Sequence, residues 1–171
     1  MRKLDESGSV GNYGLQDQRL ALEWVQKNIM AFGGDPANVM IDGCSAGAGS
    51  TANHAVNKHS WPFFSKAAGE SGMFAMWNAN TLATAESVYR QMANFTGCAG
   101  GMHSDTVVSC LQGKSAADII RASALLPGLM LTIPRIDKIV WAPVVDGVDT
   151  VGHPCTALPM ILFLSSSSCR N

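Results

Sequence analysis

Apolar residues recur at helical spacing in the first third of the chain. Four of them fall at positions i, i+3, i+7 and i+10: Leu22, Val25, Ile29 and Phe32. This spacing places them on one face of a helix and leaves polar residues for the opposite face. The pattern therefore predicts a helix over residues 15–32, which a pair of glycines and an Asp-Pro step then end.

A short apolar run follows this helix and precedes a stretch of small residues. The run covers residues 39–41 and is typical of a buried strand. Ala48, Ala52 and Ala55 recur after it at helical spacing, and their small side chains permit a helix to pack closely on a sheet. We expect a strand followed by a helix that ends near residue 56.

Later segments continue the alternation of strand and helix. The pattern predicts a strand over 66–71, helices over 81–94, 105–112 and 116–125, and an extended segment over 133–145. Ser104 and Ser115 are expected to cap the last two helices, the second with Asp118 three residues further on. The expected fold class is α/β, a segment of parallel sheet with flanking helices, because too few strands are visible for a complete sheet.

Composition narrows the range of functions. The chain has 171 residues, of which 47% are apolar, so it can bury a sizeable core. Its 13 acidic and 12 basic residues predict neither nucleic-acid binding nor attraction to a membrane surface. The five cysteines form no C-x-x-C pair, and neither a metal nor another cofactor is expected. The apolar run at 158–164 is too short to span a membrane, and no signal peptide is visible.

A G-x-S-x-G motif, Gly43 to Gly47, lies between the first predicted strand and its helix. A serine in a tight turn between strand and helix is the arrangement of a nucleophile elbow, where a strained backbone lifts the hydroxyl above the sheet. Ser45 is therefore the candidate nucleophile. Gly43 and Gly47 are expected to be glycines because side chains there would collide with the neighbouring strand or helix. The pentapeptide alone is weak evidence, since a chance match has odds of roughly one in seven in a chain of this composition.

Longer stretches lead into this motif and continue beyond it. They read GNYGLQDQ at 11–18, ALEWVQKNI at 21–29, FGGDPANV at 32–39 and GCSAGA at 43–48. Weaker matches follow at Glu70-Ser71-Gly72, Trp77, Gly97-Cys98, Cys110-Leu111 and residues 143–147. In this order they resemble the type-B carboxylesterases and cholinesterases, which have the α/β-hydrolase fold. The resemblance covers about residues 11–154.

This resemblance implies a serine ester hydrolase that acts on a small-molecule or lipid ester. Ser45 would attack the ester carbonyl and form an acyl-enzyme, which water then hydrolyses. The backbone N–H of Ala46 would be one donor to the oxyanion. Trp77 would line the acyl pocket, although its spacing from the preceding Ser-Gly pair is one residue shorter than in the family.

The resemblance also implies a disulfide between Cys98 and Cys110. The alternative is two free thiols in a reducing cytosol. Asn94 begins an Asn-Phe-Thr glycosylation sequon, which points the same way as the disulfide but is short enough to arise by chance. Together these features favour a secretory, extracellular or ER-lumen location.

Three parts of the family's catalytic machinery are not found in this chain. The glycine-rich oxyanion loop would precede residue 11, and the catalytic acid and histidine would follow residue 171. Cys44 also stands where the family usually has glutamate. We therefore expect a central fragment, with an unpatterned start at 1–10, a partial carboxylesterase domain at 11–154 and a disordered, non-family tail at 155–171. Alone it is expected to be inactive, to expose apolar surface and to dissolve poorly.

None of the histidines is expected to serve as the base for Ser45. All four are expected at the surface, with His54 facing away from the serine on the elbow helix: His54, His59, His103 and His153. A base must reach the serine hydroxyl, and no spacing in the chain favours this.

The remaining polar residues near the motif are expected to be structural. Asp42 and Glu70 have no histidine to orient, so solvated or structural carboxylates are the better interpretation. Ser71 imitates the motif, but Met73 occupies the position of the second glycine, so Ser71 is expected at the end of a strand.

Two other interpretations compete with an esterase segment. One is a non-catalytic binding or adhesion module related to cholinesterases, although such proteins typically lose the serine that this chain keeps. The other is a gene fragment without independent function. The genomic sequence on either side of the reading frame would separate these alternatives.

Overall fold

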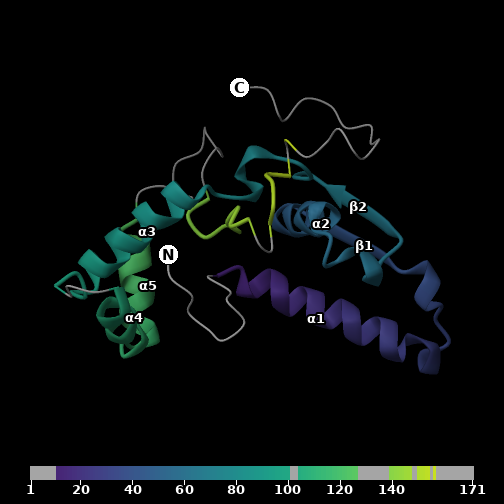
Figure 1. Ribbon diagram of the computed structural model, residues 1–171, viewed down its shortest axis with the longest axis horizontal. Coiled ribbons are helices and arrows are strands. Elements are labelled where there is room, and N and C mark those ends of the chain that lie inside the picture. The colour runs from purple at the N-terminus through teal and green to yellow at the C-terminus, as the bar shows by residue number, and fades with distance from the viewer. Residues whose placement is uncertain (1–10, 101–103, 127–138, 148–149, 155, 157–171) are drawn as a thin grey trace.

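The computed structural model describes residues 11–100, 104–126, 139–147, 150–154 and 156. The expected start at 1–10, His103 and nearly all of the expected tail at 155–171 lie outside these residues. Two groups of elements are visible (Figure 1). One contains a helix–sheet unit with α1, α2, β1 and β2, and the other contains the helices α3, α4 and α5.

The first predicted helix forms in two parts. The α-helix α1 covers Tyr13–Asn28, and a 3₁₀ helix then covers Ile29–Phe32 and ends at Gly33, where φ is 81°. Leu22, Val25 and Ile29 are half-buried as expected, but Phe32 is 72% exposed. The face prediction is wrong for Phe32 because the chain tightens at residue 29, so the 3.6-residue period does not extend to it.

The sheet contains two parallel strands, β1 (Met40–Cys44) and β2 (Lys66–Glu70). Their register pairs Met40 with Lys66 and Cys44 with Glu70. The helix α2 (Ala46–Val56) connects them and packs against both strands. Three short 3₁₀ helices interrupt the connecting loops: Pro36–Asn38, Trp61–Phe63 and Met76–Asn78. The predicted alternation of strand, helix and strand is confirmed.

Small residues bring α2 close to the sheet. Ala48 and Ala52 are fully buried, and Ala55 is 7% exposed. A Cβ placed on Gly69 of β2 would lie 3.2 Å from the Cβ of Ala48. The expected packing of this helix on the sheet is therefore present, and the elbow at its start sits at the carboxyl end of β1.

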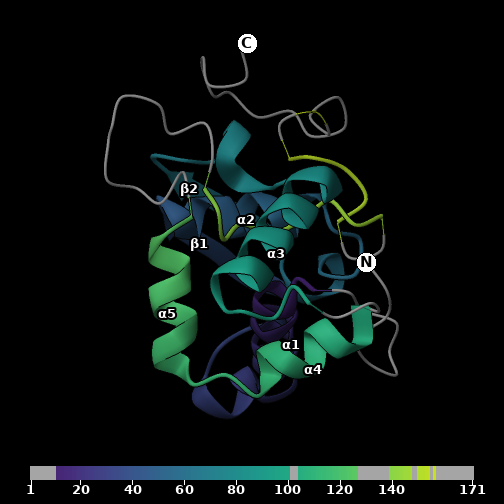
Figure 2. The same cartoon turned by 90° about the vertical axis from the view of Figure 1, so that its left-hand side faces the viewer.

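The second group consists of α3 (Leu82–Phe95), α4 (Ser104–Gln112) and α5 (Ala116–Ala124). Seen along the long axis of the molecule, α3 lies between α5 and α4 (Figure 2). Ser115 caps α5 by accepting a hydrogen bond from the Asp118 N–H, as expected, whereas Ser104 is the first residue of α4. Apolar residues of the three helices line a cavity of about 590 Å³ that continues to residues 140–144.

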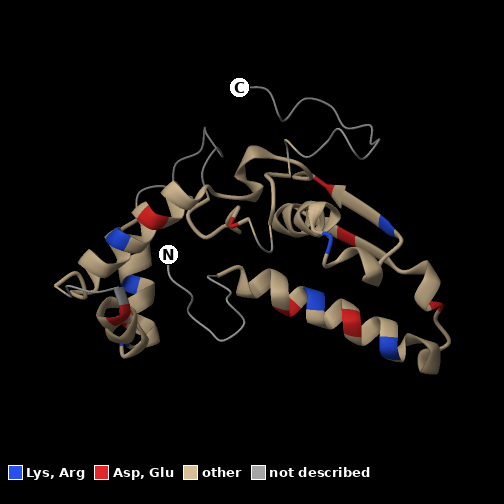
Figure 3. Cartoon of the chain, in the orientation of Figure 1, with Lys and Arg blue, Asp and Glu red and all other residues tan. Residues whose placement is uncertain are grey.

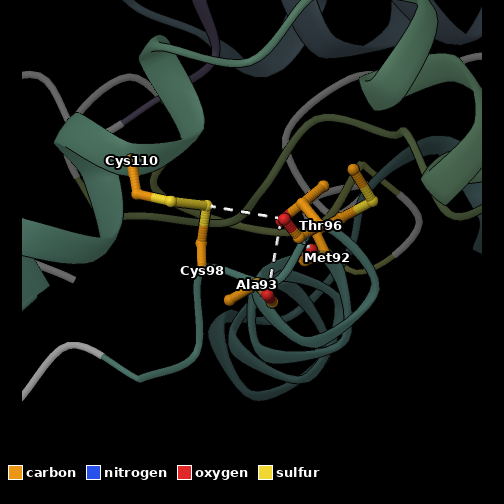
Figure 4. Close-up of a disulfide and its surroundings, with 5 residues drawn as sticks. All are labelled: Met92, Ala93, Thr96, Cys98 and Cys110. Carbon is orange, nitrogen blue, oxygen red and sulfur yellow. Dashed lines mark hydrogen bonds between the residues drawn. A yellow bond between two sulfur atoms is a disulfide. The ribbon is translucent and has the colours of Figure 1, made fainter.

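A disulfide joins the end of α3 to α4 (Figure 4). Cys98 and Cys110 are bonded, with their Cα atoms 5.7 Å apart, which confirms the expected pair. Cys98 is buried beside Ala93 and Val107. The bridge therefore holds the two helices together across a small apolar cluster.

Two asparagines connect the groups to the late segment at 139–147. Asn12 donates to the Val144 carbonyl over 2.8 Å, accepts from the Val144 N–H over 2.7 Å and donates to Asp146 over 3.0 Å. Asn80 forms an isolated parallel bridge with Val144. An extended segment was expected over 133–145. In its described part, residues 139–145, the bridge at Val144 is the β-structure present.

Charged residues of both signs are dispersed over the helices (Figure 3). Each of α1, α3 and α5 has an exposed ion pair between residues one turn apart, and such pairs contribute little to stability. Within the described ranges, no helix is long and apolar enough to cross a membrane.

Large apolar side chains are exposed on the helix–sheet unit, as expected. Examples are Leu20, Trp24, Phe32 and Met40, each more than half exposed. Trp24 and Phe32 lie beside each other, with ring centroids 6.1 Å apart. Exposed surface of this kind supports the expectation of poor solubility, which stays a prediction.

Candidate active site

Ser45 occupies the turn between β1 and α2. Its backbone has φ 55° and ψ −116°, an unusual conformation for a residue other than glycine. The Ser45 N–H donates to the Glu70 carbonyl over 2.9 Å, and the Ser45 carbonyl accepts from the Gly49 N–H over 3.0 Å. Sheet and helix thus hold the residue from both sides, against a strain of roughly 1–3 kcal/mol.

The Ser45 side chain is available at this turn. The residue is exposed, and its hydroxyl makes no capping hydrogen bond to α2. Ala46, the first residue of the helix, is exposed as well. The first N–H groups of a helix have no intrahelical acceptor, so the backbone beside Ser45 presents donors to a negatively charged oxygen.

The two glycines of the motif have different roles. A Cβ on Gly43 would lie 2.2 Å from the carbonyl carbon of Gly47 and 2.7 Å from the Ala48 nitrogen. Strand and helix backbones therefore touch at Gly43, as expected. Apart from its chain neighbours and the backbone of its own helix, no described atom lies within 4 Å of a Cβ on Gly47, so among the described residues no contact accounts for that glycine, and its steric role stays a prediction.

Trp77 packs directly beside this turn. A Cβ on Gly72 would lie 2.6 Å from the Trp77 ring and 2.8 Å from the Ser45 carbonyl oxygen. A Cβ on Gly49, in the first turns of α2, would lie 3.1 Å from the same ring. The indole is therefore next to the elbow, even though its spacing along the chain departs from the family pattern.

Two buried asparagines hold the Trp77 loop against α2. The Asn53 side chain donates to the Gly49 carbonyl and to the Asn78 carbonyl, each over 2.9 Å. The Asn78 side chain donates to the Gly72 carbonyl over 3.0 Å. Both asparagines are 1% exposed. Sequence reasoning missed both. The available signal was Asn53 itself, a polar residue next to Ala52 on the buried face of α2.

His54 is buried and not at the surface, which corrects the expectation. It is 4% exposed, and its Nδ1 lies 2.9 Å from the Ser60 hydroxyl. Its Nε2 lies 3.0 Å from Oε1 of Gln18 on α1. The amide oxygen can only accept, so this assignment puts the proton on Nε2, with Nδ1 accepting from Ser60. Both ring nitrogens are occupied, and His54 is not available as a base for Ser45.

Burial makes the charge on His54 unfavourable. Desolvation, and secondly the nearby positive charge of Arg19, lower the pKa of His54 from 6.5 to about 4. The neutral ring therefore joins α1, α2 and the turn at Ser60.

We expect stability to fall in mild acid because of His54. Its folded pKa lies below its unfolded pKa, so between pH 6.5 and about 4 the unfolded chain binds a proton that the folded chain excludes. The contribution of neutral His54 to the free energy of unfolding is complete above pH 6.5. It falls by roughly 2–3 kcal/mol as the pH drops toward 4. Urea unfolding at pH 7 and at pH 4.5 measures it. His54→Gln should show a smaller loss between these values, and an equal loss in both proteins would contradict the assignment.

The other sequence-predicted residues are not gathered around Ser45. His59 is exposed as expected, whereas His153 is half-buried and its Nε2 lies 3.1 Å from the Met76 carbonyl. Asp42 and Glu70 are exposed, and Ser71 follows the last residue of β2, as expected. In the part of the chain that the structure describes, no hydrogen bond joins a histidine to Ser45.

Cys44 is the residue before Ser45. It is exposed and free, unlike the bonded pair at 98 and 110. Its thiol stands at the end of β1, where the register pairs it with Glu70.

Comparison with known proteins adds to this geometry. The sequence model of the carboxylesterase family matches residues 3–166, which extends beyond 11–154 at both ends. A cholinesterase of Mus musculus is 38% identical over 151 residues, covering 88% of this chain and 24% of that protein. An acylcarnitine hydrolase of Rattus norvegicus is 36% identical over 164 residues, covering 89% of this chain and 29% of that protein. Esterase E4 of Myzus persicae is 42% identical over 116 residues, covering 66% of this chain and 20% of that protein. The chain spans about a quarter of the length of these relatives.

Proposed function

The chain belongs to the carboxylesterase family, and we propose that it contributes the nucleophile of a carboxylic ester hydrolase. The observation that carries the proposal is the strained conformation of Ser45 between β1 and α2, with the side chain exposed. A serine held in this way has its hydroxyl free to approach a substrate at the carboxyl end of a strand.

The proposed reaction is acyl transfer through Ser45. The hydroxyl oxygen attacks the ester carbonyl, its proton passes to a base, and the alcohol leaves from the tetrahedral intermediate. Water then hydrolyses the acyl-enzyme and restores the serine. The Ala46 N–H at the start of α2 is proposed as one donor to the oxyanion.

Trp77 is proposed to form one wall of the site for the acyl group. Its ring lies against Gly49 and Gly72, and Gly72 also approaches the Ser45 carbonyl oxygen. The proposed substrates are small-molecule or lipid esters, because an aromatic wall beside the nucleophile offers apolar contact and no charged partner.

The Cys98–Cys110 bridge bears on where the protein works. Structural disulfides form and persist mainly in oxidising compartments. We propose a secretory route, ending outside the cell or in the ER lumen.

The role of Ser45 can be tested in a chimera. Residues 11–154 would replace the matching segment of the mouse cholinesterase, and the secreted chimera would be assayed with an activated aryl ester. We expect turnover that falls by at least about 10³-fold in Ser45→Ala, since loss of the nucleophile leaves only the binding and oxyanion contributions. Ser50→Ala on the same helix is the matched control. Equal turnover in both variants would place the nucleophile elsewhere.

A binding or adhesion module is the second candidate. It is favoured by the position of His54, whose ring nitrogens contact Ser60 and Gln18 and not Ser45. A secreted chimera that binds a substrate analogue without any turnover would support it.

A further inference from the structure

We propose that Asn94 carries an N-linked glycan at the end of α3. The tripeptide Asn94-Phe95-Thr96 is the one place in the 171-residue sequence where asparagine is followed two residues later by serine or threonine, with no proline between. The proposal concerns the surface of the helical group and does not depend on the role of Ser45.

The side chain of Asn94 is accessible in the folded chain. Met92 and Ala93, the residues before it, are buried against the other helices, whereas Asn94 and Phe95 face outward. Phe95 is 45% exposed. No hydrogen bond to another described residue engages the Asn94 amide, so a sugar can be attached without breaking a contact of the fold.

The position leaves room for a bulky group. α3 ends at Phe95, and Gly97, Ala99 and Gly100 just beyond it are exposed. This end of α3 lies at the opposite side of the molecule from α2 and β1 (Figure 1). A glycan there would be attached on the side of the molecule away from the turn at Ser45 (Figure 1) and next to the exposed Phe95.

The disulfide provides the second, independent observation. Cys98 lies two residues after the sequon and is bonded to Cys110 (Figure 4). Eukaryotic cells form such bonds in the compartment where asparagine glycosylation takes place. Both features therefore require the same route, and they are four residues apart in the sequence.

The transfer uses a lipid-diphosphate-linked oligosaccharide as the donor. The Asn94 amide nitrogen forms a bond to the anomeric carbon of the donor sugar and loses one proton. The bond from that carbon to the diphosphate oxygen breaks, and the lipid diphosphate leaves with the electron pair. No oxidant or reductant takes part.

Thr96 indicates when this transfer occurs. Its hydroxyl donates to the Met92 carbonyl over 2.6 Å in the folded chain, so it is engaged once α3 has formed. The adjacent disulfide then fixes the end of the helix. We therefore expect attachment during synthesis, before this end of α3 closes.

The test expresses residues 1–171 behind a cleavable secretory leader in mammalian cells. Cell-associated and secreted protein are both analysed by intact mass, before and after a glycosidase that converts glycosylated asparagine to aspartate. We expect the chain to be heavier by one glycan and, after the enzyme, to contain aspartate at position 94. Asn94→Gln and Thr96→Ala should abolish the mass increase, whereas Thr96→Ser keeps the sequon and should retain it.

Leader cleavage keeps the result decisive even where the chain folds poorly, because it reports entry into the lumen independently of folding. A cleaved leader together with an unmodified Asn94 in both fractions overturns the proposal. A glycan that persists in Thr96→Ala overturns it as well, because the modification would not then depend on the sequon.

Discussion

Gly43→Ala is expected to unfold the elbow, and it is one of the two largest effects predicted for this chain. The added methyl group would lie 2.2 Å from the carbonyl carbon and 2.3 Å from the carbonyl oxygen of Gly47, and 2.7 Å from the Ala48 nitrogen. All three are backbone atoms, which cannot move aside as a flexible side chain can. The strand and α2 would have to separate, and we expect a loss of at least about 3 kcal/mol, a large share of the stability of a small domain.

Gly47→Ala is the matched control for this prediction. It adds the same methyl group four residues further on, where no described atom outside its chain neighbours and its own helix backbone lies within 4 Å. Alanine also has a higher helix propensity than glycine. The unfolding free energy of Gly47→Ala should therefore stay within about 1 kcal/mol of that of the unchanged chain. Urea unfolding of the three proteins, followed by circular dichroism, measures the contrast. Equal midpoints for the two variants would show that β1 and α2 are not in contact at Gly43.

The purified chain is expected to show no ester turnover beyond that of its Ser45→Ala variant. The base that Ser45 needs is absent from the described surroundings, since His54 contacts Ser60 and Gln18. A general base typically contributes 10²–10⁴-fold and one oxyanion donor about 10²–10³-fold. Among the described residues no base contacts Ser45, and the Ala46 N–H is the one oxyanion donor proposed, so turnover should lie roughly 10⁴-fold or more below that of an intact member of the family.

An activated aryl ester gives the most sensitive assay of this prediction, with both proteins purified in parallel. Folding should be compared first, through the Cys98–Cys110 bond in a non-reducing peptide map. Robust hydrolysis by the chain and none by Ser45→Ala would contradict the prediction. It would also show that a group not joined to Ser45 in this structure can act as its base.

Local signals in the sequence were sufficient to predict the turn at Ser45 between β1 and α2. The apolar run before Gly43, the small residues after Ser45 and the strain that such a turn requires are all properties of adjacent residues. Element positions in the described parts follow the predicted ones closely, because each helix has its own periodicity and its own capping or stop residue.

Residues whose roles depend on distant partners were not predicted. His54 resembled a surface histidine, since its partners Gln18 and Ser60 come from another helix and a turn. Asn53 and Asn78 were missed for the same reason, because the hydrogen bond between them joins α2 to a loop 25 residues further on. Periodicity shows which face of a helix is apolar, but it does not show which polar group a buried polar side chain meets.

The contact between Asn12 and Val144 has a consequence for how the protein is made. The two residues are 132 positions apart. A ribosome releases Asn12 first and Val144 only after the five described α-helices have left the exit tunnel, so the sheet and these helices can form while Asn12 still faces water. Chains whose synthesis stops shortly before residue 144 would contain every helix and strand described here, yet their two groups of elements would lack these hydrogen bonds. Such incomplete chains should therefore be cleaved preferentially between the groups, near Asn80, by the proteases that monitor new proteins.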